Sequence, residues 1–184
     1  HPIKLFYTIP NFQNPTGIQC SREKRKDVAE SLMNYNTVLI EDDPYGEIAF
    51  TEDIMPPLYS YIPEQTILLG SFSKIVAPGL RVGWMIANPE IIRKAAIMKQ
   101  ASDLQTCNLS QFILADFLER NDLDLHLKEI KSAYKNQCAL MLDGLRSYFP
   151  STVKYTESKG GMFTWLTLPG TISSRQLLQR ALKE

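Results

Sequence analysis

The sequence predicts an α/β fold in which a mostly parallel sheet is flanked by helices and is followed by the start of a small α+β C-terminal domain. Two apolar runs, residues 37–42 and 66–71, show no alternation with polar residues. This absence indicates strands that are buried on both faces, as in a parallel sheet. Patterns of helical period separate and follow these runs. Near the C-terminus, two β-rich stretches flank the turn "ESKGG".

The first part of the chain alternates between strand and helix patterns. Residues 3–9, "IKLFYTI", form a β-rich run, and the next segment, "NFQNPTG" (11–17), has the composition of a turn. Ser21 is the predicted N-cap of the helix that follows. Residues 81–87, "RVGWMIA", supply a fourth strand candidate after the two buried runs.

Helical patterns dominate the second half of the chain. We expect helices at 89–101 and 108–119, a long helix at 123–149, and a final helix at the C-terminus. One stripe of the long helix carries Leu127, Ile130, Tyr134, Cys138, Met141, Leu145 and Tyr148. We therefore expect residues 1–135 to belong to a large domain, and residues 136–184 to form the end of a bridging helix and part of a small C-terminal domain.

Composition narrows the function classes. Of 184 residues, 44% are hydrophobic, and 20 basic residues balance 20 acidic ones. With no basic stripe, the sequence argues against nucleic acid as a direct partner. Its three cysteines are far apart and belong to no metal-binding motif, which indicates a reducing, cytoplasmic compartment and predicts no metal. No apolar run reaches the roughly 18 residues of a membrane span.

Both ends of the chain suggest a longer protein. The sequence opens directly in an apolar run without Met, and it closes in a helical pattern with no glycine cap. We expect the chain to be an internal piece.

Chemically active side chains follow three of the predicted strands. The segments are "YTIPNFQNPTG", "LIEDDPY" and "LLGSFSK". In open parallel sheets, ligands bind at the carboxyl ends of the strands. The sequence thus predicts one site at this edge of the sheet.

The segment "GSFSK" (70–74), together with Arg81, has the groups needed to bind a phosphate. Two hydroxyls and a two-pronged guanidinium are suitable donors. The Walker pattern is absent, which argues against a nucleoside triphosphate. Lys74 is either a solvated loop charge or a buried amine of lowered pKa, as covalent catalysis on a carbonyl requires.

Three consecutive acids, Glu41, Asp42 and Asp43, follow the second strand. Alternation along a strand prevents all three from entering one site, so paired-carboxylate chemistry is a weaker interpretation than a single acid acting with Tyr45. A solvated cluster of acids at the strand end is the alternative. Similarly, Asn14 either points into the site or makes a local turn.

Taken together, these groups fit one ligand, pyridoxal 5'-phosphate. Its aldehyde would react with Lys74, and its pyridinium nitrogen would pair with an acid. Tyr45 and Asn14 would contact its phenolic oxygen. The serines and Arg81 would bind its phosphate.

The segments "NFQNPTG", "IEDDPYGEI", "LGSFSKIVAPGLRVGW" and "GGMFTWLTLP" resemble the fold-type I, class I/II pyridoxal-phosphate aminotransferases, nearest the 2-aminoadipate and kynurenine aminotransferase subgroup. The likeness covers essentially the whole chain. It implies that Lys74 is the internal-aldimine lysine and that Asp42, three residues before Tyr45, pairs with the pyridine nitrogen. It further implies cofactor contacts for Tyr45 and Asn14 at the 3-hydroxyl, and for Ser71, Ser73 and Arg81 at the phosphate.

The resemblance implies an enzyme that transfers an amino group between an amino acid and a 2-oxo acid, and a homodimer when the protein is complete. Two other functions stay open. One is the aminotransferase-like sensing domain of a MocR-type transcription regulator, and the other is a lyase or acyl-transferring synthase of the same fold.

Overall fold

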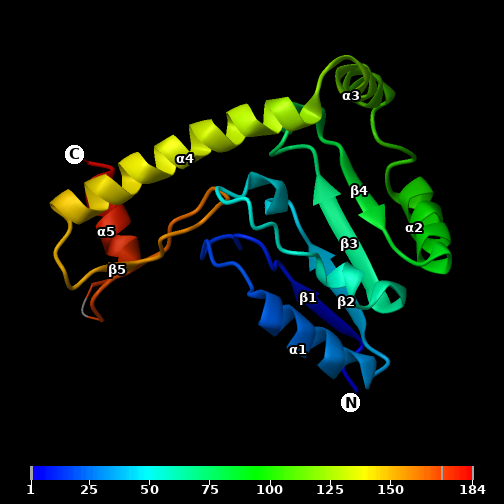
Figure 1. The fold of residues 1–184 in the computed structure, drawn as a ribbon, viewed down its shortest axis with the longest axis horizontal. Coiled ribbons are helices and arrows are strands. Elements are labelled where there is room, and N and C mark those ends of the chain that lie inside the picture. Colours follow the sequence, from blue (N-terminus) through cyan, green and yellow to red (C-terminus); the bar gives the residue numbers. More distant parts are fainter. Residues whose placement is uncertain (1, 171, 184) are drawn as a thin grey trace.

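The computed structural model of the chain describes residues 2–170 and 172–183, and its elements follow the predicted order (Figure 1). The sheet strands and first helix are β1 (Leu5–Thr8), α1 (Arg22–Met33), β2 (Val38–Asp42), β3 (Thr66–Ser71) and β4 (Gly83–Ile86). The remaining elements are α2 (Pro89–Ser102), α3 (Asn108–Arg120), α4 (Leu123–Tyr148), β5 (Lys154–Tyr155), β6 (Leu166–Thr167) and α5 (Ser174–Ala181).

The four-stranded sheet has the order β1-β2-β3-β4. The first three strands are parallel, and β4 runs antiparallel to β3, which confirms a mostly parallel sheet. In this register Tyr7 pairs with Ile40, and Asp42 pairs with Leu69. The carboxyl ends of β1, β2 and β3 therefore meet at one edge.

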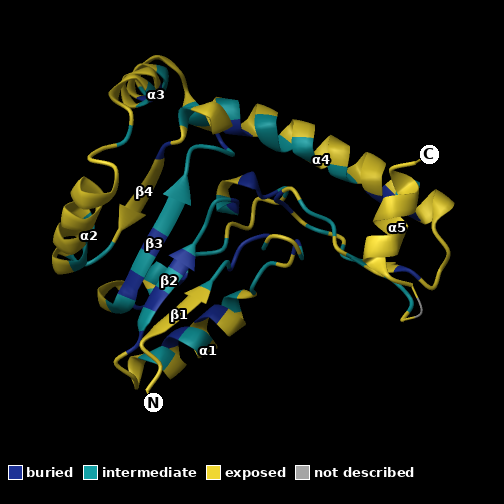
Figure 2. Cartoon of the chain, turned by 180° about the vertical axis from the view of Figure 1, so that it is seen from behind, coloured by how far each residue is buried: buried dark blue, intermediate teal, exposed yellow. Residues whose placement is uncertain are grey.

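The edge strands β1 and β4 are mostly exposed, whereas burial alternates along the inner strand β2 (Figure 2). On β2, Leu39 and Glu41 are fully buried, whereas Val38, Ile40 and Asp42 are half-buried. The prediction that this strand is buried on both faces is therefore wrong for the described residues. The reason is that α1 and the short helix at 58–60 pack only on the Leu39 face.

Helix α1 begins where its cap was predicted. The backbone N–H of Lys24 donates to the Ser21 hydroxyl over 3.2 Å, which satisfies one of the free donors of the first turn. The buried residues of this helix are Arg25 and Ala29. A charged side chain thus lies on the face that packs against the sheet.

The long helix α4 crosses one side of the molecule (Figure 1). Near its start, Leu127 packs in a cluster with Ile48 and Ile75. Farther along, the predicted stripe is wrong at Met141 and Tyr148, which are 57% and 87% exposed. The buried side chains of α4 are Leu127, Leu142 and Leu145, because the helix does not lie flat on the sheet along its length. The predicted domain boundary at 135/136 falls within this helix.

After α4 the chain returns to the sheet through residues 156–163, here called the strap. The N–H of Phe50 donates to the carbonyl of Lys159 over 2.8 Å, and the N–H of Gly161 donates to the carbonyl of Ile48 over 2.9 Å. On the other side, the Thr156 hydroxyl donates to the carbonyl of Thr16 over 3.0 Å. The strap therefore binds the loops that follow both β1 and β2.

Two glycines allow the strap to approach Phe12 closely. A Cβ atom at Gly160 would lie 2.3 Å from Cζ of Phe12, and one at Gly161 would lie 2.4 Å from its Cβ. Gly161 also has a φ of +70°, which favours glycine. The "GG" of the strap is thus explained by packing and backbone conformation.

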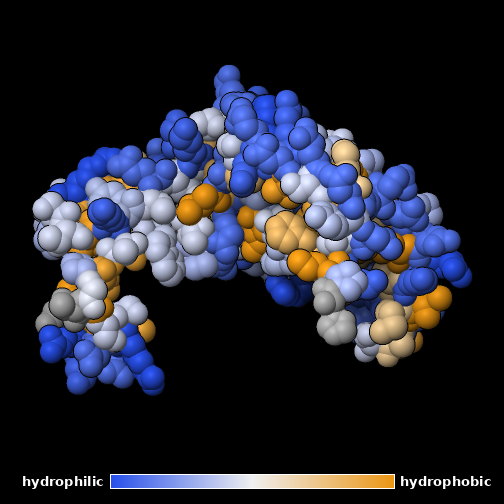
Figure 3. Space-filling model, turned by 90° about the horizontal axis from the view of Figure 1, so that it is seen from below, coloured by the Kyte–Doolittle hydropathy of each residue, from blue (hydrophilic) through white to orange (hydrophobic). Residues whose placement is uncertain are grey.

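The surface is mostly hydrophilic when seen from below, with apolar side chains in its central part and at the edge formed by α2 (Figure 3). Ile97 and Met98 of α2 are 55% and 65% exposed. No helix among the described residues combines the length and apolar character needed to cross a membrane. The three cysteines are free thiols.

Candidate functional site

The predicted site residues lie in the loops at the carboxyl ends of β1, β2 and β3. Asn14 follows β1, Asp42 is the last residue of β2, and Ser71 is the last residue of β3. Tyr45 immediately precedes the short helix Gly46–Ile48, and Lys74 lies in the turn after β3. Because the three strands are parallel neighbours, their loops share one edge of the sheet.

The three consecutive acids point to different surroundings. Asp42 lies on the half-exposed face, where its carboxylate accepts a 2.5 Å hydrogen bond from the Tyr7 hydroxyl. Glu41, on the buried face, accepts the backbone N–H groups of Leu58 and Tyr59, each over 2.8 Å. Asp43 instead binds Asn11 and Gly46. Of the three, Asp42 alone faces the side of the sheet that Tyr7 occupies.

Ionisation equilibria reflect these surroundings. The hydrogen bond to Asp42, with a smaller contribution from burial, raises the pKa of Tyr7 to about 12, so its phenol stays a donor at neutral pH. Burial raises the pKa of Glu41 and of Asp43. Sequence reasoning missed Tyr7, because its alignment with Asp42 depends on the strand register.

Tyr45 is 6% exposed and packs against the ring of Phe163 in the strap. The two ring centres are 5.5 Å apart with an interplanar angle of 84°, an edge-to-face arrangement. Burial raises the pKa of Tyr45, and a hydrogen bond with the Asn14 side chain partly offsets the rise. Asn14 and Tyr45 are therefore neighbours, and Phe163 is a third member of this group, which the sequence analysis did not name as a site residue although it lies in the segment "GGMFTWLTLP".

The turn that carries Lys74 is held from both sides. Within the turn, the N–H of Ser73 donates to the Ser71 hydroxyl over 3.1 Å. Ile75, the next residue after Lys74, is buried against α4. Nε2 of His126 in α4 lies 3.0 Å from the carbonyl oxygen of Ile75. His126 thus fixes the backbone beside Lys74, a role the sequence did not predict.

Arg81 lies at the end of the short helix Pro78–Leu80. Its backbone is left-handed, with φ 55° and ψ 38°, and its side chain is exposed. One guanidinium nitrogen lies 3.4 Å from the Pro78 carbonyl oxygen. Among the described residues, no carboxylate lies within ion-pair distance of Arg81 or Lys74. Two positive charges near two serines suit an anionic group.

The set of donors and acceptors fits pyridoxal phosphate. The cationic and hydroxyl groups after β3 match its phosphate and aldehyde. Asp42, whose side chain accepts the hydrogen bond from Tyr7, matches its protonated ring nitrogen. The adjacent phenol and amide of Tyr45 and Asn14 match its phenolic oxygen.

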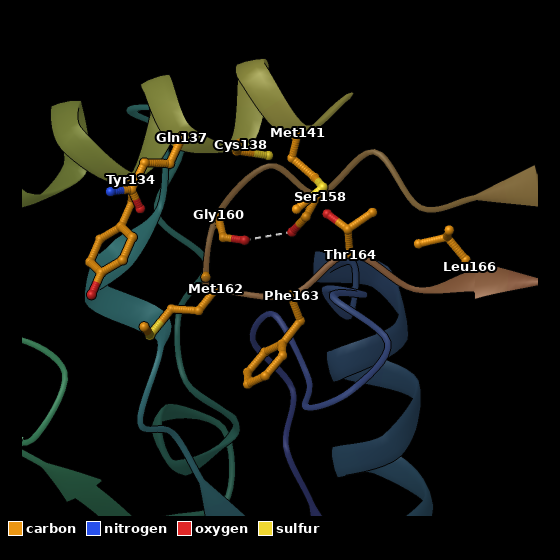
Figure 4. Close-up of a pocket in the computed structure, with 11 residues that line it drawn as sticks. Tyr134, Gln137, Cys138, Met141, Ser158, Gly160, Met162, Phe163, Thr164 and Leu166 are labelled. Atoms are coloured by element: carbon orange, nitrogen blue, oxygen red, sulfur yellow. Dashed lines mark hydrogen bonds between the residues drawn. The ribbon is translucent and has the colours of Figure 1, made fainter. Parts of the chain in front are cut away.

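A separate cavity of about 340 Å³ lies between α4 and the strap (Figure 4). Its lining includes Tyr134, Cys138, Met141 and Met162, and none of the predicted site residues. Phe163 leaves the strap on the side away from α4, towards the loop that follows β1. Phe163 lines this cavity and its ring also packs against Tyr45, so this residue lies between the cavity and the candidate site.

Comparisons with known proteins agree with a pyridoxal-phosphate site, because the similar proteins include named aminotransferases. The family model for aminotransferase class I and II matches residues 4–184. The chain is 41% identical over 180 residues to aromatic-amino-acid aminotransferase 1 of Thermococcus litoralis, covering 97% of the chain and 43% of the relative. It is 38% identical over 185 residues to 2-aminoadipate transaminase of Thermus thermophilus, covering 98% and 46%.

A solved structure and a transcriptional regulator are also similar to this chain. The crystal structure of Pyrococcus horikoshii kynurenine aminotransferase, in complex with PMP, matches with a TM-score of 0.93 and 40% identity, over 98% of this chain and 45% of that one. An uncharacterized HTH-type transcriptional regulator of Bacillus subtilis is 32% identical over 181 residues, or 98% of the chain and 37% of the regulator. The chain spans less than half the length of each of these proteins.

Proposed function

Because this chain belongs to the aminotransferase class I and II family, we propose that it is part of a pyridoxal-phosphate-dependent aminotransferase acting on an amino acid and a 2-oxo acid. The observation that carries the proposal is the convergence of Asp42, the Asn14–Tyr45 pair and the Lys74 turn at the carboxyl ends of three parallel strands.

Lys74 provides the reactive amine. Its Nζ would hold the cofactor at the aldehyde carbon, and as a free amine it would take the proton from the substrate's α-carbon. Bound pyridoxal phosphate supplies the electron sink for the resulting carbanion. General acid–base catalysis of this kind contributes about 10²–10⁴-fold.

The other residues bind and orient. Asp42 holds a proton on the ring nitrogen by charge pairing, and Tyr7 keeps the Asp42 carboxylate in place. Tyr45 and Asn14 hydrogen-bond the phenolic oxygen. Arg81, together with the hydroxyls of Ser71 and Ser73, binds the phosphate.

The rest of the proposal concerns the whole protein. We propose a cytoplasmic homodimer with no direct nucleic-acid or membrane partner. Within it, residues 1–135 belong to the cofactor-binding domain, and residues 136–184 comprise the end of the bridging helix and part of the small domain. The supporting observation is the similarity over nearly the whole chain to enzymes named as aminotransferases.

A second candidate is the aminotransferase-like domain of a transcription regulator. The 32% identity to the Bacillus subtilis regulator favours it, although the aminotransferases are more similar. The sequence that precedes His1 in the parent protein discriminates between them. A helix-turn-helix segment there would favour the regulator.

The test uses the full-length parent protein incubated with pyridoxal phosphate, reduced with borohydride, digested and examined by mass spectrometry. We expect the pyridoxyl adduct on the peptide that contains Lys74, and amino transfer in a panel of amino donors and oxo acceptors. Lys74→Ala should lose both, whereas Lys135→Ala, at an exposed position of α4, should lose neither. An adduct that persists in Lys74→Ala would refute the assignment, and release of ammonia without a new amino acid would indicate a lyase.

A further inference from the structure

Asp43 joins two loops of the candidate site without being part of it. One carboxylate oxygen accepts the side-chain N–H of Asn11 over 2.8 Å, and the other accepts the backbone N–H of Gly46 over 2.8 Å. Asn11 lies in the loop that carries Asn14. Gly46 follows Tyr45 directly, so the contacts of Asp43 bracket Tyr45 within its own turn.

The orientation of Asn11 is fixed by a buried arginine. Its side-chain oxygen accepts Nη2 of Arg25 over 2.6 Å and the amide of Gln19 over 3.2 Å. Arg25 is 0% exposed and also donates to the carbonyls of Cys20, Pro10 and Pro56. Rotating the Asn11 amide would place its NH₂ group against this guanidinium. The amide N–H must therefore face Asp43.

Close packing at Gly46 leaves no free space around the Asp43 carboxylate. A Cβ atom there would lie 2.4 Å from one oxygen of Asp43 and 2.9 Å from the Asn11 amide nitrogen. The carboxylate thus sits directly against the glycine backbone. Any group that fails to pair with both Asn11 and Gly46 must push the turn away.

We propose that Asp43 is a positioning residue that couples the loop carrying Asn14 to the turn carrying Asp42 and Tyr45, so that these three side chains are held ready for the cofactor. This inference rests on the proposed function. Asp43 acts through Asn11 and Gly46 and touches neither cofactor nor substrate. If the turn is correctly placed for only part of the time, the apparent dissociation constant rises by the inverse of that fraction.

The experiment is an exchange of the two partners in the full-length protein. In Asp43→Asn, either orientation of the new amide sets an NH₂ group against a second N–H, from Asn11 or from Gly46. In Asn11→Asp, two carboxylates face each other. The double variant restores one carboxylate and one amide in swapped positions, with the same net charge.

The readouts are the dissociation constant of pyridoxal phosphate, the absorption spectrum of the bound cofactor and the thermal midpoint of unfolding. We expect each single variant to bind the cofactor about tenfold more weakly, as for the loss of one charge-assisted hydrogen bond. The double variant should return to within about threefold of wild type. Asp42→Asn should not be rescued by Asn11→Asp, because Asp42 has a different partner.

A control separates positioning from general stability. Thr66→Val removes a buried hydrogen bond to the carbonyl of Ile62, at the start of β3 and away from the loops. It should lower the thermal midpoint without changing the affinity or spectrum of the cofactor. If the single variants fail to fold, Asn11→Ala deletes the contact without opposing like groups and should weaken cofactor binding in the same direction.

The outcomes distinguish the two proposals. If wild type does not bind pyridoxal phosphate, the proposed function fails and this inference fails with it. If wild type binds but Asp43→Asn and Asn11→Asp, or Asn11→Ala in their place, bind equally well, the inference alone is overturned. It is also overturned if the double variant is no better than the weaker single variant.

Discussion

The Tyr7 hydroxyl donates to the Asp42 carboxylate over 2.5 Å, across two adjacent parallel strands. Tyr7 pairs with Ile40, so both side chains project from the same face of the sheet. The hydrogen bond from the phenol limits the rotation of the carboxylate. In the proposed enzyme, this contact orients the acid that pairs with the cofactor's ring nitrogen.

Tyr7→Phe removes this contact and keeps the ring. We expect the cofactor still to bind and the turnover number to fall by about fivefold, equivalent to roughly 1 kcal/mol for a partly exposed hydrogen bond to a charged group. Steady-state kinetics of the full-length protein measure the effect. The control is Tyr35→Phe, at an exposed position outside the candidate site, which should leave the kinetics unchanged. Equal kinetics in the two variants would contradict this role.

The same pair predicts a pH effect on stability. The pKa of Tyr7 rises from 10.0 to about 12 on folding, so the neutral phenol is favoured in the folded state. The contribution is complete below about pH 10 and is lost as pH rises towards about 12, because the unfolded phenol ionises first. Urea unfolding of wild type and Tyr7→Phe should show a constant difference up to pH 9 that narrows above about pH 10. A difference that widens above pH 10 would be inconsistent with this assignment.

Gly160 of the strap and Gly144 of α4 predict opposite effects of the same glycine-to-alanine substitution on stability. Gly160→Ala would place a methyl group 2.3 Å from the Phe12 ring and should destabilise by about 1–3 kcal/mol through overpacking. Gly144→Ala, in α4 with nothing within 4 Å, should stabilise by roughly 0.5–1 kcal/mol. Denaturant unfolding of both variants checks the pair. The packing explanation fails if both change stability in the same direction.

Two arginines of α1 are expected to contribute differently to the stability of the fold. Arg25→Met would leave Glu41, Asn11 and three backbone carbonyls without their partner and should cost about 3–5 kcal/mol. Arg22 pairs with Asp53 over 3.2 Å at the surface, so Arg22→Met should cost no more than about 1 kcal/mol. Urea midpoints compare the two. Similar midpoints would mean that the buried arginine contributes little.

The contact between Phe163 and Tyr45 predicts that the strap affects the site. Phe163→Leu removes the edge-to-face interaction and should cost about 0.5–1.5 kcal/mol of stability. It should also shift the absorption of bound cofactor, since Tyr45 loses one side of its support. Phe112→Leu, at a 72% exposed position of α3, is the control and should change neither. An unchanged spectrum in Phe163→Leu would contradict the prediction that the strap influences the cofactor site.

The sequence predicted the order of elements well because each carried a local signal. Ser21 marked the start of α1, and the unbroken apolar runs marked β2 and β3. The direction of β4 and the one-sided burial of β2 had no such signal. They depend on which elements pack together, and strand periodicity does not encode this.

The candidate site shows the same division. Its motif residues were predicted from the strand ends, where a parallel sheet collects ligand-binding groups. Tyr7, His126 and Phe163 were missed because they act through register and long-range packing. Asp43 stood out in the sequence only as one of three consecutive acids. Its partnership with Asn11, 32 positions earlier in the chain, becomes visible only after folding.

Ile48 contacts the chain both at the start of α4 and in the strap that follows this helix. Its side chain packs against Leu127 at the start of α4, and its carbonyl accepts the N–H of Gly161 when the strap returns. A tilt of the 26-residue helix would thus change the packing of a residue that lies three positions from Tyr45.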